Sequence, residues 1–284
     1  MEIAIADQQV FLFRDQITPQ YAEVKAREKK MVAFNTLSKF GSILNHPKDD
    51  DFELVYSEHR YQPFWHVRAS TRYVYDRDAK YKVSTRSSEV KSITLIEKHY
   101  NADNGYIEIP VTEHCIQEED TEVFIDGITG RNQTELAGYM TFAPEKMQEE
   151  FTKIAPKDSI FVPPQMRVSA IIRDILSKMI KAIQADKINE ETIDVPVVDL
   201  YYRPVYAFQF LWKSKAKEAI VEVDALTGTV KSGSRVFSEY IGKVVDQNFL
   251  FDLGADVAGL LFPGGSIAVK VVKKCIDMKK TKNK

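Results

Sequence analysis

The spacing of apolar residues changes along this 284-residue chain and predicts where helices and strands lie. From Phe52 onward, aromatic and β-branched residues alternate with polar ones, which predicts strands. Residues 165–185 instead carry apolar side chains at helical spacing, which predicts an amphipathic helix. A second helix is expected from Thr18 to about Lys39, because threonine caps helices and Pro19 suits the first helical position. Its inward positions are predicted to be Val24, Val32, Leu37 and Phe40.

Two sequence elements occur twice and in the same order. A Tyr-x-Pro strand at residues 61–63 aligns with another at 202–204, and apolar or aromatic residues follow in both. An Asp-x-x-Thr-Gly run at 126–130 aligns with one at 224–228, each after a β-type segment. In such turns the aspartate accepts main-chain N–H groups and the glycine supplies a positive φ. Because a helix is also expected before each proline strand, the chain is predicted to contain an internal duplication.

The two copies differ in length. The second runs from its proline strand to its turn through a short hairpin near Lys213–Ala216. In the first, residues 70–120 intervene, and Asn104-Gly105 within them is a hairpin signal. The first copy is therefore expected to carry a β-rich insertion.

The second copy resembles the PepSY family over residues 165–232, through its helix, its proline strand and the ending VEVDALTGTV. The first copy departs from that pattern through its insertion. The resemblance implies a helix packed on a small antiparallel sheet. It also implies a non-catalytic role, since such domains are associated with the inhibition or regulation of peptidases and with envelope proteins.

Together these patterns predict an α+β fold of two helix-plus-antiparallel-sheet units, followed by a C-terminal helical hairpin. The first unit is assigned to residues 1–135, with its insertion at about 70–120. A proline-containing linker follows at 136–163, and the PepSY-like unit at 164–235. Residues 236–284 are assigned to the helical hairpin and a basic tail.

The C-terminal segment 249–272 is the most apolar part of the chain. Pro263-Gly264-Gly265 divides it, and each half is too short to cross a bilayer core of about 30 Å. The predicted hairpin therefore packs on the protein's own sheet, docks on a partner or a second copy, or lies on an anionic membrane surface. The candidate contact residues are Lys270, Lys273, Lys274, Lys279 and Lys280.

Composition narrows the function classes. The formal net charge is −2, which gives no support for nucleic-acid binding. The two cysteines, Cys115 and Cys275, are far apart in sequence, so neither a disulfide framework nor a cysteine-only zinc site is expected. The N-terminus has no basic region before its apolar residues, unlike a signal peptide. A cytoplasmic location is predicted, with contact to the inner membrane surface as an option.

Candidate chemistry is sparse. Two histidines, His59 and His66, flank the first proline strand, but their odd spacing directs them to opposite faces of a strand. Adjacent His114 and Cys115 would also point apart, which does not suit a cysteine nucleophile and its base. No catalytic residue, metal ligand or cofactor is assigned on these patterns.

Strand aromatics are the most suggestive binding residues. One face of these strands is expected to be core, as is usual for strand aromatics, and the other is the candidate cradle for an extended peptide or a flat ligand. The set consists of Tyr61, Trp65, Tyr202 and Tyr206. The leading hypothesis is a non-enzymatic binding or regulatory module that recruits a protein or peptide by strand addition. One alternative is a hydrolytic enzyme with its site in the β insertion. Another is a structural subunit that assembles through the C-terminal hairpin.

Overall fold

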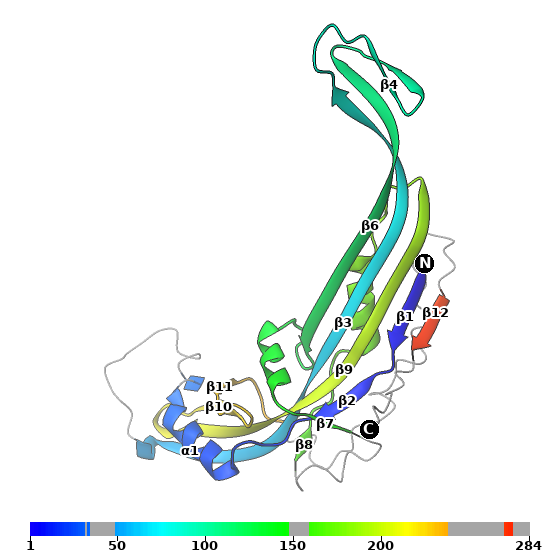
Figure 1. The fold of residues 1–284 in the computed structure, drawn as a ribbon. Helices are drawn as coiled ribbons and strands as arrows, with labels where there is room; N and C mark the ends of the chain where they lie inside the picture. Colours follow the sequence, from blue (N-terminus) through cyan, green and yellow to red (C-terminus); the bar gives the residue numbers. More distant parts are fainter. Residues whose placement is uncertain (32, 35–48, 148–158, 238–269, 275–284) are drawn as a thin grey trace, which may run out of the picture.

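A computed structural model describes residues 1–31, 33–34, 49–147, 159–237 and 270–274. Its main feature is a ten-stranded mixed sheet built on three long strands, β3 (Phe52–Ser84), β6 (Tyr106–Asp126) and β9 (Lys187–Trp212) (Figure 1). The shorter strands are β1 (Glu2–Ala6), β2 (Gln9–Leu12), β4 (Ser92–Leu95), β5 (Lys98–Asn101), β7 (Glu145–Lys146), β8 (Ile160–Phe161), β10 (Lys217–Asp224), β11 (Val230–Gly233) and β12 (Lys270–Lys274). The helical elements are α1 (Pro19–Lys29), α3 (Val168–Met179) and the 3-10 segments η1 (Asp49–Asp51), η2 (Thr134–Thr141) and η4 (Lys213–Lys215).

Strand β3 is the centre of the sheet. It pairs antiparallel with β9 on one side and with β6 on the other, and parallel with the short β8. Strand β9 in turn pairs antiparallel with β10 and parallel with β1 and β2. Strand β11 pairs antiparallel with β10, and β12 pairs parallel with β1.

The residues predicted as an insertion lengthen one hairpin. Strands β3 and β6 pair without a register shift from Phe64 opposite Asp126 to Ser84 opposite Tyr106. Strand β9 accompanies them only to Lys187, opposite Asp76. Beyond that point β3 and β6 form a two-stranded arm with the small β4–β5 sheet at its tip (Figure 1).

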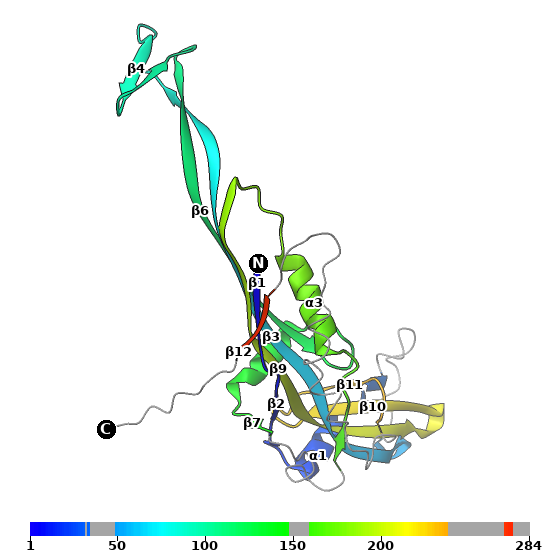
Figure 2. The same cartoon turned by 90° about the vertical axis from the view of Figure 1, so that its right-hand side faces the viewer.

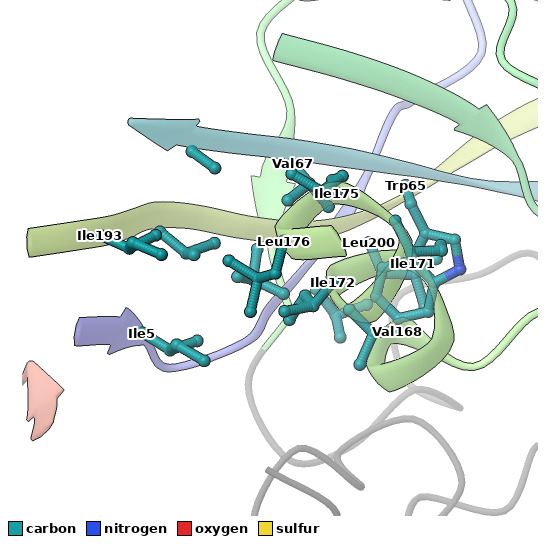
Figure 3. Close-up of a cluster of buried hydrophobic side chains, with 14 of the residues drawn as sticks. Ile5, Trp65, Val67, Val168, Ile171, Ile172, Ile175, Leu176, Ile193 and Leu200 are labelled. Atoms are coloured by element: carbon teal, nitrogen blue, oxygen red, sulfur yellow. The ribbon is translucent and has the colours of Figure 1, made fainter. Parts of the chain in front are cut away.

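Helix α3 covers the middle of the sheet, seen beside β3 and β9 in Figure 2. Its apolar positions are buried as the helical spacing predicts, against the core drawn in Figure 3. The buried helix residues are Val168, Ile171, Ile172, Ile175, Leu176 and Met179. Across from them lie Trp65, Val67 and Leu200 of β3 and β9.

Helix α1 packs differently, on the β9–β10 end of the sheet. Thr18 caps it as predicted, since its hydroxyl accepts a hydrogen bond from the N–H of Tyr21. The buried positions are Ala22 and Ala26, whereas Val24 is 53% exposed, so its predicted inward position is wrong. Small residues suit this face because the strand aromatics beneath, such as Phe210, fill the space. The other predicted inward positions, Val32, Leu37 and Phe40, lie outside the described residues.

The two matched sequence elements make the same main-chain hydrogen bonds. In the turns, the N–H of Gly127 donates to the carbonyl of Pro63 at 2.9 Å, and the N–H of Ala225 donates to that of Pro204 at 3.0 Å. Gly130 and Gly228 both have a φ of 69°. We call residues equivalent when these shared bonds align them.

Segments before the two helices are equivalent as well, and each bonds to the other copy. The N–H of Phe13 donates to Tyr202, and the N–H of Val162 donates to Tyr61. Further on, the N–H groups of Gln16 and Gln165 donate to the carbonyls of Ala225 and Gly127. The segment preceding each helix is therefore exchanged onto the other copy's strand and turn.

This exchange overturns the predicted architecture of two helix-plus-antiparallel-sheet units. The structure is predominantly β, and the two copies share one sheet because β3 pairs with β9 along most of its length. At the centre of that pairing Gln62 lies opposite Arg203, and these two positions are equivalent. A sequence read one segment at a time predicts each hairpin separately and cannot show that their strands pair with one another.

The predicted C-terminal helical hairpin is also wrong where it can be checked. Residues 270–274, expected in its second helix, form strand β12. Valines at two of these five positions favour a strand, and the edge of β1 supplies a pairing partner. The rest of the predicted hairpin lies outside the described residues.

Candidate functional site

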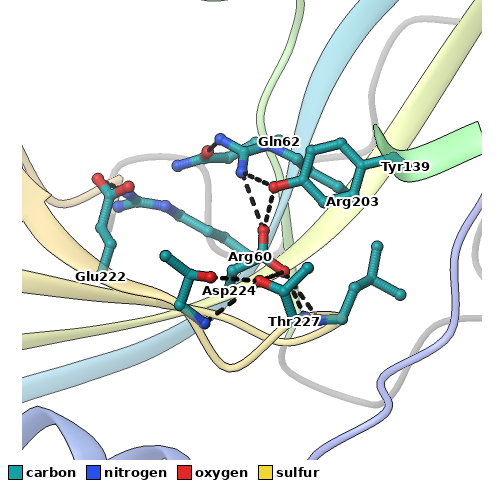
Figure 4. A network of polar contacts seen from close by, with 9 residues as sticks. Arg60, Gln62, Tyr139, Arg203, Glu222, Asp224 and Thr227 are labelled. Carbon is teal, nitrogen blue, oxygen red and sulfur yellow. Dashed lines mark hydrogen bonds and ion pairs between the residues drawn. The ribbon is translucent and has the colours of Figure 1, made fainter. Parts of the chain in front are cut away.

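Polar side chains gather where the two copies meet (Figure 4). They lie on the sheet face opposite α1 and α3, and we call the face that these two helices cover the helix-bearing face. The guanidinium of Arg203 donates to Gln62 Oε1 at 2.6 Å, to Tyr139 Oη at 2.8 Å and to Asp224 Oδ2 at 3.1 Å. The hydroxyl of Tyr139 donates to the same carboxylate. Burial raises the pKa of Tyr139 to about 12, so the phenol stays protonated as that bond requires.

A second arginine on this face is fully buried. Arg60 donates to Glu58 at 2.6 Å and to Glu222 at 2.5 Å, and it lies 4.7 Å from the centroid of the Phe237 ring. The N–H of Phe237 donates to both carboxylate oxygens of Glu58. Burial, followed by repulsion from Arg203, lowers the pKa of the neighbouring Lys231.

These two networks are built to hold the copies together. Each joins a β3 side chain to one from β9 or β10 in the buried centre, and each arginine has an aromatic ring over it. Removing one partner of a buried ion pair strands the other charge, so such networks fix a single pairing register. We assign them a structural role, because their donors and acceptors are directed at one another.

On the helix-bearing face, His59 of β3 makes two polar contacts. Its Nδ1 is 2.7 Å from Ser159 Oγ, and its Nε2 is 3.1 Å from Asp15 Oδ1. The hydroxyl of Tyr206 donates to the other Asp15 oxygen at 3.1 Å. The imidazole lies 4.7 Å from the Tyr206 ring and 5.1 Å from the Tyr61 ring, measured between centroids. Sequence reasoning weighed His59 but missed Asp15 and Ser159, which lie far from it in the chain.

The structure divides the four predicted binding aromatics into two pairs. Tyr61 and Tyr206 border His59, whereas Trp65 and Tyr202 do not. Tyr61 also belongs, with Trp65 and Tyr202, to the core beneath α3. All four are buried on the helix-bearing face. The indole N–H of Trp65 donates to the carbonyl of Met166, which fixes the ring against the start of that helix.

The other histidines lie elsewhere. His66 bonds Glu122 at 2.7 Å and stacks on Phe124, on the face opposite His59. His114 bonds Asp76 at the base of the arm, and no contact links it to the free thiol of Cys115. Across the described residues, no three His, Cys, Asp or Glu side chains are grouped as a metal site.

Asp199 of β9 lies opposite His66 and has an altered acidity. Burial raises its pKa to about 6, an effect only partly offset by the Tyr201 hydroxyl. Its equivalent in the first copy is Glu58, which has Arg60 as a close partner. The buried carboxylate at this position thus has a close arginine partner in the first copy, whereas in the second copy the cost of burying its charge is only partly offset.

The outer edge of β6 is the longest open strand edge in the described part of the chain. Phe124 accepts a bond there from the N–H of Gln133, and Asp126 donates to Arg131, so even-numbered residues direct their main-chain groups outward. Because β6 has no register shift, the same holds along the strand, and β3 is the only strand paired with it in the described sheet. We name residues 111–122 the β6 edge. It contains five acidic residues and no lysine or arginine.

The predicted contact lysines are placed only in part. Lys270, Lys273 and Lys274 belong to β12, while Lys279 and Lys280 lie outside the described residues. Among the helices that the structure describes, none combines the length and the apolar character needed to span a membrane.

Comparisons with known proteins add no relative. No protein-family model matches this chain, and neither the curated proteins nor the solved structures give a match. The resemblance to PepSY domains therefore stays a prediction, and function must be argued from the geometry above.

Proposed function

We propose that this protein is a binding or regulatory module that takes up an extended segment of a partner by strand addition to the β6 edge. The observation that carries the proposal is the row of outward main-chain groups from Thr112 to Glu122, which lacks a neighbouring strand in the described sheet. Natural proteins usually protect such an edge with charged side chains, a bulge or a proline. This stretch has no bulge and no proline, and its charged side chains are all acidic, which leaves it open to a basic strand. An added strand would satisfy these groups directly.

The β6 edge also defines the chemistry of the partner. Several of its carboxylates form ion pairs with β3, such as Glu113 with Arg77 and Glu118 with Arg72. Exposed pairs of this kind are weak, so these carboxylates remain free to exchange partners. Among them Ile116 is 62% exposed and offers an apolar contact. The partner is therefore proposed to be a protein or peptide segment that is extended, basic and carries an apolar residue at its centre.

A cytoplasmic location of this protein is part of the same proposal. The described cysteine, Cys115, is a free thiol opposite Tyr75 of β3, which suits a reducing compartment such as the cytoplasm. A basic extended segment of a cytoplasmic protein would reach the β6 edge without crossing a membrane.

Panning a random peptide library on the immobilised protein tests this function. We expect enrichment of basic, β-forming sequences with micromolar affinity. In hydrogen exchange, the outward N–H groups of Ile116, Glu118 and Asp120 should exchange quickly in the free protein and slowly in the complex. Peptides that leave these amides unprotected would contradict strand addition.

Two substitutions at one position give a matched control. Ile116→Pro removes an outward N–H without affecting the pairing with β3, whereas Ile116→Ala keeps the N–H and removes only the side chain. We expect the proline to weaken binding at least tenfold and the alanine by less than threefold, with both unfolding temperatures close to that of the unmodified protein. Equal losses in the two variants would show that side chains, and not the strand edge, bind the peptide.

A further inference from the structure

The surroundings of His59 differ from those of the equivalent residue in the other copy. That residue is Leu200, which pairs with Val10 on one side and with Trp65 on the other, all in the apolar core. His59 pairs with Tyr206, and Ser159 lies beside it just before β8. The backbone arrangement is shared, so the contrast lies in the side chains. The apolar residues Val10, Trp65 and Leu200 of one copy thus correspond to the polar residues Ser159, Tyr206 and His59 of the other.

Hydrogen bonding fixes which ring nitrogen of His59 holds the proton. An ionised aspartate only accepts, so the contact with Asp15 requires an N–H on Nε2. In the neutral imidazole the lone pair of Nδ1 then faces Ser159, whose Oγ lies 2.7 Å away and donates to it in that state. Asp15 is itself held by the Tyr206 hydroxyl. A serine that donates to a histidine held by an aspartate is the arrangement of an activated nucleophile.

The partial exposure of His59, Asp15 and Ser159 is compatible with a reaction at the Ser159 hydroxyl. The side chains of His59 and Asp15 are 14% and 23% exposed, and Ser159 is half-buried. These groups are shielded enough to hold their geometry yet open enough to meet a small molecule. The rings of Tyr61 and Tyr206 are buried and pack against the imidazole, which holds His59 in place.

We propose that Ser159 is a nucleophile for acyl transfer from small uncharged esters, with His59 as general base and Asp15 as positioning residue. The Ser159 oxygen bonds to the ester carbonyl carbon while its proton moves to Nδ1 of His59. The C–O bond to the leaving alcohol breaks, and the alcohol takes that proton. Water then attacks the acyl-serine through the same base, which releases a carboxylic acid and restores the Ser159 hydroxyl. This activity is independent of the β6 edge and departs from the expected non-enzymatic role.

A fluorophosphonate probe tests the nucleophile directly, because it forms a bond to an activated serine and releases fluoride. We expect one adduct per chain by intact mass spectrometry, mapped to Ser159 by peptide sequencing, and slow hydrolysis of p-nitrophenyl acetate. Ser159→Ala should abolish both signals. The matched control Ser177→Ala, on the exposed side of α3, should change neither.

Variants of His59 and Asp15 show whether Ser159 is labelled because these residues activate its hydroxyl or only because the hydroxyl is exposed. His59→Gln should slow labelling of Ser159 at least about 100-fold, the usual contribution of a general base. Asp15→Asn should slow it as well, since the amide can donate to Nε2 and favour the tautomer that no longer accepts from Ser159. Both are compared at equal folded fraction, judged from circular dichroism. An unlabelled Ser159, or equal labelling rates in the unmodified protein and His59→Gln, would overturn the proposal.

Discussion

The part of the sheet beneath α3 and the part beneath α1 are built from equivalent residues but are stabilised in different ways. Under α3, large apolar helix residues meet an apolar strand face around Leu200. Under α1, the helix contributes small residues and the strands contribute aromatic ones, and the polar group around His59 lies next to this core. A duplicated scaffold thus keeps its main-chain bonding while the side chains of one copy change, and such departures from symmetry indicate where to look for function.

The largest expected difference concerns the two turn aspartates. Asp126 and Asp224 both accept turn N–H groups through Oδ1, but only Asp224 also accepts from Arg203. Asp126→Ala should therefore reduce the free energy of unfolding by about 1–2 kcal/mol, the cost of losing these bonds. Asp224→Ala should cost about 3–5 kcal/mol, because it also leaves a buried guanidinium without its carboxylate. Urea unfolding measures both, and equal losses would show that the ion pair adds nothing to the turn.

The two helices give the second contrast. Leu176 of α3 is fully buried and Val24 of α1 is largely exposed. Leu176→Ala should reduce the free energy of unfolding by about 3 kcal/mol through the cavity it leaves. Val24→Ala should stay within about 0.5 kcal/mol. A large loss at Val24, measured in the same urea titration, would mean that α1 uses this side chain after all.

A smaller difference is expected at the turn glycines. Gly130 and Gly228 share a φ of 69°, so alanine is strained at both by about 1–2 kcal/mol. Only at position 130 would the added Cβ come within 2.9 Å of Met166 Cγ. We expect Gly130→Ala to cost about 1 kcal/mol more than Gly228→Ala for this reason. If the excess persists in a Met166→Ala background, a contact with Met166 is not its cause.

The last contrast is a pH dependence that belongs to Asp199. Its pKa is raised to about 6 in the folded protein, whereas the unfolded chain releases this proton near pH 4. The folded state therefore binds more protons between these values, and its stability falls as the pH rises through that window. A pKa difference of about two corresponds to about 2.7 kcal/mol in the free energy of unfolding. Because the carboxyl is partly exposed, we expect only about 1–2 kcal/mol of this.

The substitution Asp199→Asn checks this dependence. The variant should be more stable than the unmodified protein at pH 7.5 by about 1–2 kcal/mol, and the two should converge near pH 4. Glu58→Gln, at the equivalent position, should instead destabilise the protein, because Arg60 would lose one of its two carboxylate partners. A gain in stability from Glu58→Gln would contradict the compensation assigned to that pair.

Local features of this protein were determined by the sequence alone. The buried face of α3, the Thr18 cap and the two Asp-x-x-Thr-Gly turns were all predicted from residues close together in the chain. They could be predicted because the bonds and contacts that define them join neighbouring residues. The repeat itself was visible for the same reason, since each turn keeps its own bonding residues.

Pairing between distant segments was decided only by the tertiary structure. The prolines illustrate this, since Pro63 and Pro204 lie inside long central strands although proline usually occupies an edge. Each proline carbonyl accepts from a turn N–H, so the proline nitrogen faces the same side. On that side lies the gap between two consecutive neighbours, β8 and β6 for Pro63 and β2 and β10 for Pro204, where no donor is needed. Exchange of the copies likewise brought Asp15, His59 and Ser159 together. The periodicity of a strand predicts which of its side chains share a face, but which strand pairs with it is decided by the whole fold.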